Sequence, residues 1–175
     1  MSQIPRRRRS LLRSGHRLLL SPLLLAGCWY GFAGGGLPAG IKTAAVLPFD
    51  NLTTEPTLTQ QVNTAVRAAM LDRLGLRSAG EETADALVRG SITRYEPDLP
   101  VAYTGSGQNN VSVTQRALQI TLNIEIIDQK AGKPLWQRNG LIVESNYAPG
   151  QETDGRAKAL DKLITDIVDG AQSQW

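Results

Sequence analysis

Histidine and cysteine are nearly missing from this 175-residue chain, which has one of each, His16 and Cys28. Both lie at the N-terminal end, in or just after a segment with the composition of a cleaved secretory leader, residues 1–27. Without that leader the chain has no imidazole, which excludes Ser-His-Asp and Cys-His catalysis and zinc sites built from His or Cys. Carboxylate, Lys or Tyr chemistry stays open, although adjacent acids such as Glu81 and Glu82 are more typical of solvated surface. We therefore predict a protein that is not an enzyme, with no catalytic residue, no metal site and no cofactor.

A long hydrophobic run is missing as well. The apolar part of the leader, residues 18–25, is interrupted by Ser21 and Pro22. It is shorter than the roughly 20 residues that a membrane-spanning helix needs. Arginines precede it, so the segment has the basic and apolar regions of a signal peptide.

The leader ends in a lipoprotein-type cleavage site, Leu25-Ala26-Gly27-Cys28. We predict that residues 1–27 are removed and that Cys28 becomes a lipid anchor; the alternative is an ordinary leader followed by a free thiol. Position 29 is Trp rather than the Asp that usually retains such lipoproteins in the inner membrane. The anchor is therefore expected in the outer membrane, with the protein facing the periplasm and residues 28–41 forming a tether.

Residues 28–175, which remain after removal of the leader, do not have a positive net charge. The leader contains six of the 19 Lys and Arg and none of the 16 Asp and Glu, which leaves 13 basic and 16 acidic residues and a net charge of −3. A nucleic-acid-binding domain would have a basic surface. We therefore predict no nucleic-acid partner, and residues 28–175 have the size of a single domain.

The periodicity of apolar residues predicts one α+β domain over residues 42–175. The clearest signal is at 118–126, where large aliphatic residues alternate with polar ones at the period of a strand. Apolar stripes at helical spacing lie in residues 58–74 and 157–168.

Three more strands and a loop complete the predicted order, β-α-β-β-β-α. This order favours a four-stranded, mostly antiparallel sheet covered by two helices. The additional strands are predicted at residues 43–49, 87–95 and 135–143, and a polar loop that contains Gly and Pro is predicted at 97–110.

Several short stretches carry a resemblance to a known family. They are residues 28–30, 41–49 with Asn51, 58–61, 84–92, Asp128 with 132–136, and a last amphipathic helix that closes near Trp175. Their order and spacing, together with the lipoprotein signal, resemble the LPS-assembly lipoprotein family, LptE, over the whole chain after the leader. The resemblance implies an outer-membrane lipoprotein that plugs, and helps to assemble, the LptD β-barrel, which delivers lipopolysaccharide to the cell surface.

The resemblance also implies weak binding of lipopolysaccharide, in which basic residues near the sheet contact the lipid A phosphates. This chain departs from that pattern, because residues 96–110 and 145–155 contain no Lys or Arg. Phosphate recognition needs such cations. The nearest candidates are Arg94 and Arg116, which flank the predicted loop and would be close if the second and third strands pair; the alternative is that both are solvated charges at strand ends.

A plug in a barrel lumen presents polar side chains to a polar wall. We therefore predict partner contacts from the polar side of the alternating strand and from the predicted loop. The candidate residues are Tyr103, Gln108, Gln119, Thr121 and Asn123.

Two other lipoprotein classes stay open. Residues 45–49 before an amphipathic helix, and Ala84-Asp85 before residues 90–92, are also similar to CsgG-like and LpoB-like lipoproteins. Proteins of these classes form a secretion pore or activate peptidoglycan synthases. A pore-forming protein would need strands with a lipid-facing and a water-facing side, and residues 118–126 alternate in the required way.

Overall fold

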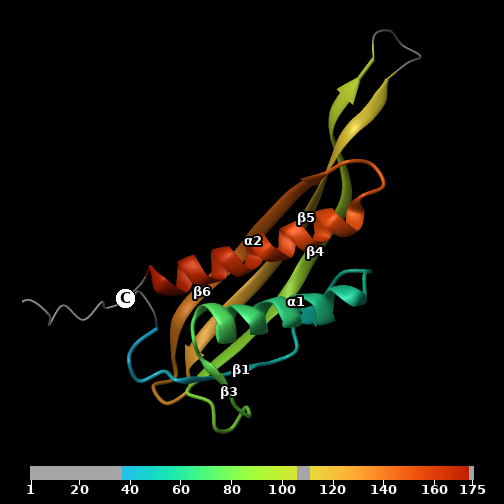
Figure 1. Cartoon of the computed structure of the whole chain (residues 1–175). Helices are drawn as coiled ribbons and strands as arrows, with labels where there is room; N and C mark the ends of the chain where they lie inside the picture. Colours follow the sequence, from blue (N-terminus) through green and yellow to red (C-terminus); the bar gives the residue numbers. More distant parts are fainter. Residues whose placement is uncertain (1–36, 106–110, 174–175) are drawn as a thin grey trace, which may run out of the picture. The chain divides into compact units, whose positions relative to one another are not determined.

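The computed structural model describes residues 37–105 and 111–173, which lie within one compact unit, Gly35–Trp175. Figure 1 shows a long twisted sheet with two helices packed across it. The elements are β1 (Thr43–Val46), β2 (Asp50–Asn51), α1 (Thr57–Ala68) with a π-helical turn (Ala69–Arg73), β3 (Arg77–Ser78), β4 (Ala86–Thr104), β5 (Ser112–Asp128), β6 (Lys133–Tyr147) and α2 (Glu152–Gln172).

The strands form one mixed sheet in the order β3-β1-β4-β5-β6, and β2 also pairs with β4. The pairs of β1 with β3, β1 with β4 and β2 with β4 are parallel, whereas β4, β5 and β6 are antiparallel. The single α+β domain is therefore confirmed, and the two long ladders of the sheet are antiparallel as expected, but the expectation of four strands is wrong. It missed β2 and β3, because a strand of two residues has no periodic pattern to detect.

The prediction of alternation along residues 118–126 is confirmed by β5. Its aliphatic side chains point to the helices and are at most 1% exposed, and its polar side chains are half-buried on the opposite side. The buried set is Leu118, Ile120, Leu122, Ile124 and Ile126. Since successive side chains of a strand point to opposite sides, this pattern decides which side of the sheet the helices cover.

Both helices lie on that side, next to each other (Figure 1). Two glycines of α2 allow its close approach to β6: a Cβ at Gly155 would lie 2.7 Å from the ring of Tyr147, and one at Gly170 would lie 2.5 Å from the ring of Trp136. Ile41, at the end of the predicted tether, is also part of the buried core. Within the described residues, neither helix is both long and apolar enough to span a membrane.

The first strand is shorter than the predicted 43–49, because β1 ends at Val46. Pro48 has no N–H to donate to the sheet. The N–H of Phe49 turns away instead and donates to Oδ1 of Asn63 in α1, at 3.1 Å. The ring of Phe49 then fills the space beside Gly90, where a Cβ would lie 2.4 Å from that ring.

The predicted loop at 97–110 is wrong for its first half, because β4 continues to Thr104 and pairs with β5 as a long hairpin. The prolines at 97 and 100 suggested a break. They are tolerated because β1 and β2 pair with β4 only up to Ile92, so that beyond this residue β4 is an edge strand. Register shifts between Glu96 and Leu99 and between Pro100 and Ala102 absorb the remaining irregularity.

Candidate functional site

The face of the sheet that the helices leave uncovered, here called the open face, is the candidate site. Its centre is a row of half-buried polar side chains from β5, which includes the predicted partner residues Gln119, Thr121 and Asn123 and continues to Glu125. The structure therefore places these three predicted residues together, on one face. Residues of β4 and β6 paired with them add further polar groups to both sides of the row.

Hydrogen bonds between strands hold the open-face side chains in place. Asn123 donates from Nδ2 to Oγ of Ser91 on β4 (3.3 Å) and accepts at Oδ1 from the N–H of Gly140 on β6 (2.8 Å). Arg89 on β4 forms an ion pair with Glu125 on β5, with Nη2 and Oε2 3.0 Å apart. The amide of Asn123 thus bridges three strands, which makes this part of the face a fixed arrangement of donors and acceptors.

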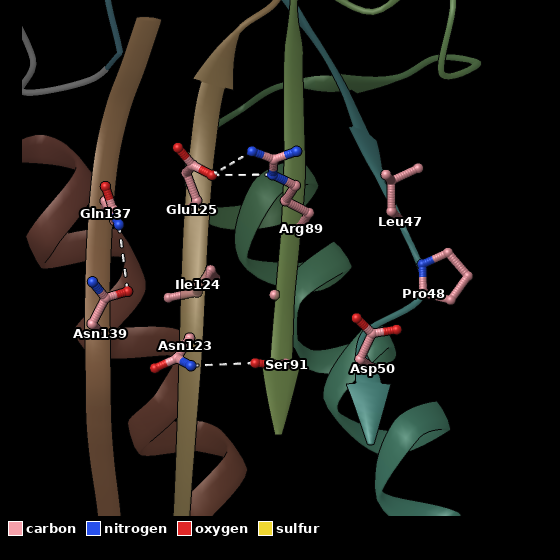
Figure 2. A pocket seen from close by; sticks show the side chains of 11 residues that line it. Leu47, Pro48, Asp50, Arg89, Ser91, Asn123, Ile124, Glu125, Gln137 and Asn139 are labelled. Carbon is pink, nitrogen blue, oxygen red and sulfur yellow. Dashed lines mark hydrogen bonds and ion pairs between the residues drawn. The ribbon is translucent and has the colours of Figure 1, made fainter. Parts of the chain in front are cut away.

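A hollow of about 410 Å³ lies on this face, between the long strands and the chain that connects β1 to β2 (Figure 2). Figure 2 shows amide and hydroxyl groups along one side and Leu47 and Pro48 along the other. Arg89 is neutralised by Glu125, so the remaining charge among the lining residues is that of Asp50. Such a lining suits neutral hydrogen-bonding groups better than a phosphate, which needs a cation.

Sequence reasoning missed the part of the hollow that β6 contributes, Gln137 and Asn139. The available signal was Asn139-Gly140 within a predicted strand, since an isolated glycine there indicates a bulge or kink. Gly140 has a φ of 65°, in the left-handed region, and the register of β5 with β6 shifts at this place. The resulting kink directs the N–H of Gly140 to Asn123.

The structure does not bring Arg94 and Arg116 together, although β4 and β5 pair as expected. Arg94 lies opposite Thr121, on the open face, whereas Arg116 lies opposite Tyr147, on the side of the helices. Thr121 and Arg116 are five positions apart on β5, which is roughly 16 Å at about 3.3 Å per residue. Arg116 is also engaged in an ion pair with Asp98. The two arginines therefore belong to separate surfaces.

The other predicted residues lie at the ends of the described chain segments or outside them. Tyr103 is near the end of β4 and is 59% exposed. Gln108 lies outside the described residues, as do the cleavage site and the anchor, which are Leu25, Ala26, Gly27 and Cys28. Within the described residues there is no cluster of acidic or other ligating side chains that would hold a metal ion.

Asp85, directly before β4, joins three parts of the sheet. Its carboxylate accepts hydrogen bonds from the backbone N–H groups of Lys42 and Thr43 (3.1 Å each) and from Oγ1 of Thr43 (2.9 Å). It also accepts one from Nζ of Lys130, in the turn between β5 and β6, at 2.6 Å. The contact with Lys130 and the backbone donors hold the pKa of Asp85 well below its ordinary value. Sequence reasoning noted Ala84-Asp85 as part of a family-like stretch without predicting this role.

We expect acid to weaken the fold through Asp85. A carboxyl whose folded-state pKa is lowered stabilises the fold above the unfolded pKa of about 4, and this stabilisation is lost as the pH falls through the folded value. Asp85→Asn should therefore lower the melting temperature at pH 7 and flatten its decline between about pH 5 and pH 2. The exposed acid Glu81, replaced by Gln, is the control. Parallel melting curves for Asp85→Asn and wild type across this pH range would contradict the assignment.

The fold and the open face define a class of protein: a single α+β domain whose helices cover one side of a mixed sheet and whose other side is a polar surface. The model of the LptE family, described as lipopolysaccharide-assembly, matches residues 41–173. The chain belongs to the LptE family. No curated protein matches it in sequence.

Solved structures resemble this fold at low sequence identity. Protein XCC0632 from Xanthomonas campestris has a TM-score of 0.51 and 14% identity, covering 79% of this chain and 90% of that one. The PelC dodecamer from Paraburkholderia phytofirmans has a TM-score of 0.47 and 15% identity, covering 78% and 92%. Lipoprotein GNA1162 from Neisseria meningitidis has a TM-score of 0.43 and 13% identity, covering 73% and 96%. Of these, the similarity to XCC0632 supports the fold.

Proposed function

We propose that this protein is an outer-membrane lipoprotein, anchored through Cys28, that plugs an LptD-type β-barrel and assists its assembly for lipopolysaccharide transport. Membership of a lipopolysaccharide-assembly family supports the proposal, as does the lipoprotein signal before residue 28. The proposed role consists of binding and assembly, without catalysis. It is exercised in the Gram-negative envelope, on its periplasmic side.

The open face is the observation that carries this proposal. A folded domain within a barrel must face a wall of polar side chains, because the interior of such barrels is polar. The row from Gln119 to Glu125 offers amide, hydroxyl and carboxylate groups at fixed positions and leaves the aliphatic side chains of β5 to the core.

Crosslinking tests the docking face. A photo-crosslinking residue placed at Tyr103 or at Thr121 should capture the barrel in cells, because Tyr103 lies on the hairpin and Thr121 on the open face. We expect the same result from Gln108, which follows β4 in the sequence. The matched controls are Lys158 and Lys162, which are exposed on α2. Capture of the barrel from the two lysine positions alone would assign docking to the helices and contradict the proposal.

Direct binding of lipopolysaccharide is the second part of the proposal, and Arg94 is the residue that we expect to contribute. It is exposed on the open face, and no ion pair engages it within the described residues, in contrast to Arg116, which Asp98 neutralises. A charge-assisted hydrogen bond contributes about 1.5–3 kcal/mol. Arg94→Ala should therefore weaken binding about tenfold or more, and Arg116→Ala should weaken it much less.

Titration of the domain with labelled lipopolysaccharide, at two salt concentrations, measures both effects. Loss of a phosphate contact should also reduce the dependence of binding on salt. Equal affinities of wild type and Arg94→Ala would remove Arg94 from the binding site. A larger loss in Arg116→Ala would instead place the site on the helix side of the sheet.

A further inference from the structure

The hollow on the open face has hydrogen-bonding groups that the fold itself does not use. Arg89 contacts Glu125 through Nε and Nη2, and both contacts are to Oε2, so that Nη1 and Oε1 stay available. Within the described residues, no hydrogen bond engages the carboxylate of Asp50, Nδ2 of Asn139 or Oε1 of Gln137. The lining thus offers both donors and acceptors to a ligand.

The charges of the hollow disfavour an ionic ligand. An anion such as phosphate would meet the carboxylates of Asp50 and Glu125, and the guanidinium of Arg89 is already paired with Glu125. A cation would have to displace Arg89 or bind Asp50 alone. Asp50 is exposed, and an exposed ion pair contributes little. A neutral ligand avoids both difficulties.

An extended peptide does not fit the hollow either, because the backbone beneath it is already paired. Gly90 lies opposite Ile124 in the ladder of β4 and β5, and the N–H of Leu47 donates to the carbonyl of Val88 at 2.9 Å. Here β4 and β5 are interior strands, with β1 and β2 on one side and β6 on the other. Strand addition needs a free edge. A ligand of the hollow is therefore recognised by side chains.

A sugar ring meets these conditions. A hydroxyl both donates and accepts hydrogen bonds, so neighbouring hydroxyls can satisfy guanidinium, amide and carboxylate groups together. The C–H faces of the ring are apolar and match Leu47 and Pro48, which line the other side of the hollow (Figure 2). The volume of about 410 Å³ lies within the range of small-molecule sites, about 300–1,000 Å³.

The polar side of the hollow is fixed before a ligand arrives. Asn123 is held by Ser91 and by the N–H of Gly140, and the ring of Phe49 fills the space beside Gly90. Groups that are already held lose little conformational freedom when a ligand binds, which favours affinity.

We infer that the hollow binds a sugar ring of lipopolysaccharide through its hydroxyl groups. The inference rests on the proposed function, which brings lipopolysaccharide to the open face, and it assigns the saccharide to the hollow and a phosphate to Arg94. One ligand can reach both places. Arg94 lies opposite Thr121, which is two positions, roughly 7 Å, from Asn123 along β5.

NMR signals of side-chain amides test the site on the full protein, purified in detergent. The probe is the dephosphorylated saccharide that mild acid releases from lipopolysaccharide. It should shift the amide signals of Gln137 and Asn139 in a saturable manner and leave that of Gln60, exposed on α1, unchanged. No shift in the hollow, or an equal shift at Gln60, would overturn the inference. Shifts caused by a peptidoglycan fragment but not by this saccharide would assign the hollow to the cell wall and also overturn it.

Two variants separate a sugar from an ionic ligand. Asn139→Ala removes a neutral hydrogen bond and should weaken the binding of intact lipopolysaccharide about fivefold, with its salt dependence unchanged. The matched control is Asn146→Ala, an exposed asparagine of β6 outside the hollow, which should stay within about twofold. Asp50→Asn keeps an oxygen acceptor and should also stay within about twofold.

The melting temperature should be retained in all three variants, because the three side chains are exposed. Equal affinities of wild type and Asn139→Ala would overturn the inference. So would a tenfold loss in Asp50→Asn that disappears at high salt, because this result would assign the hollow to a cationic group.

Co-purification of the barrel separates this inference from the proposed function. If the barrel co-purifies with the unaltered protein but the saccharide shifts neither amide of the hollow, the inference fails and the proposed function stands. If the saccharide shifts both amides but the barrel does not co-purify, the plug role fails and the saccharide site stands.

Discussion

Leu122→Asp is expected to unfold most of the protein at room temperature. Leu122 is fully buried at the centre of β5, between the helices and the sheet. Aspartate there removes the packing of a large aliphatic side chain and adds a carboxyl without a partner, which together cost on the order of 5 kcal/mol or more. This is comparable to the whole free energy of unfolding of a typical domain, about 5–15 kcal/mol. Denaturant titration followed by circular dichroism measures the change.

The neighbouring variant Asn123→Asp is the matched control. Asn123 lies on the open face, where it accepts a hydrogen bond from Gly140 and donates one to the hydroxyl of Ser91. A carboxylate preserves the first bond and accepts the hydroxyl proton of Ser91 in place of the second. The free energy of unfolding should therefore change by less than about 1 kcal/mol. Equal losses in both variants would mean that the two sides of β5 are assigned wrongly.

Cys28→Ala is expected to abolish membrane anchoring. The thiol sulfur at this position is the atom to which the diacylglyceryl group would be attached, and alanine has no nucleophile to replace it. Two or more acyl chains are needed for stable attachment, since burial contributes about 0.8 kcal/mol per CH₂ and one chain gives only reversible binding. The variant should accumulate as an uncleaved or soluble precursor, absent from the outer-membrane fraction. Mass spectrometry and density fractionation distinguish these forms.

Trp29→Asp provides the control for Cys28→Ala. It keeps the acylated cysteine and supplies the residue that retains such lipoproteins in the inner membrane. This variant should therefore carry the same lipid but move from the outer-membrane to the inner-membrane fraction. An unmodified thiol at Cys28 in the mature wild-type protein would contradict the anchor, whatever the behaviour of the two variants.

Long periodic segments were predictable from the sequence, and short or irregular ones were not. The alternation around Leu122 gave the correct buried set, and the stripe at 157–168 falls within α2. By contrast, β2 and β3 contain two residues each and depend wholly on pairing with distant strands. The continuation of β4 through Pro97 and Pro100 could likewise not be predicted from the sequence, because it depends on which edge of the strand is unpaired.

The candidate site shows the same division. Gln119, Thr121 and Asn123 are two residues apart on one strand, so their common face follows from the sequence alone. The separation of Arg94 from Arg116 does not, because register shifts along β4 and β5 decide which residues are opposite each other. The contact of Asp85 with Lys130 joins groups 45 residues apart and requires the whole sheet to be assembled.

By itself, the sequence determined the lipoprotein signal, the family-like order of motifs, and the polar and apolar sides of β5. These features are local, since each depends on neighbouring residues and their period. Only the tertiary structure decided the mixed sheet and the hollow beside Asn123. They depend on where strands that are distant in the sequence begin and stop pairing. Packing and backbone hydrogen bonds between these distant segments decide the pairing, and local sequence patterns do not predict it.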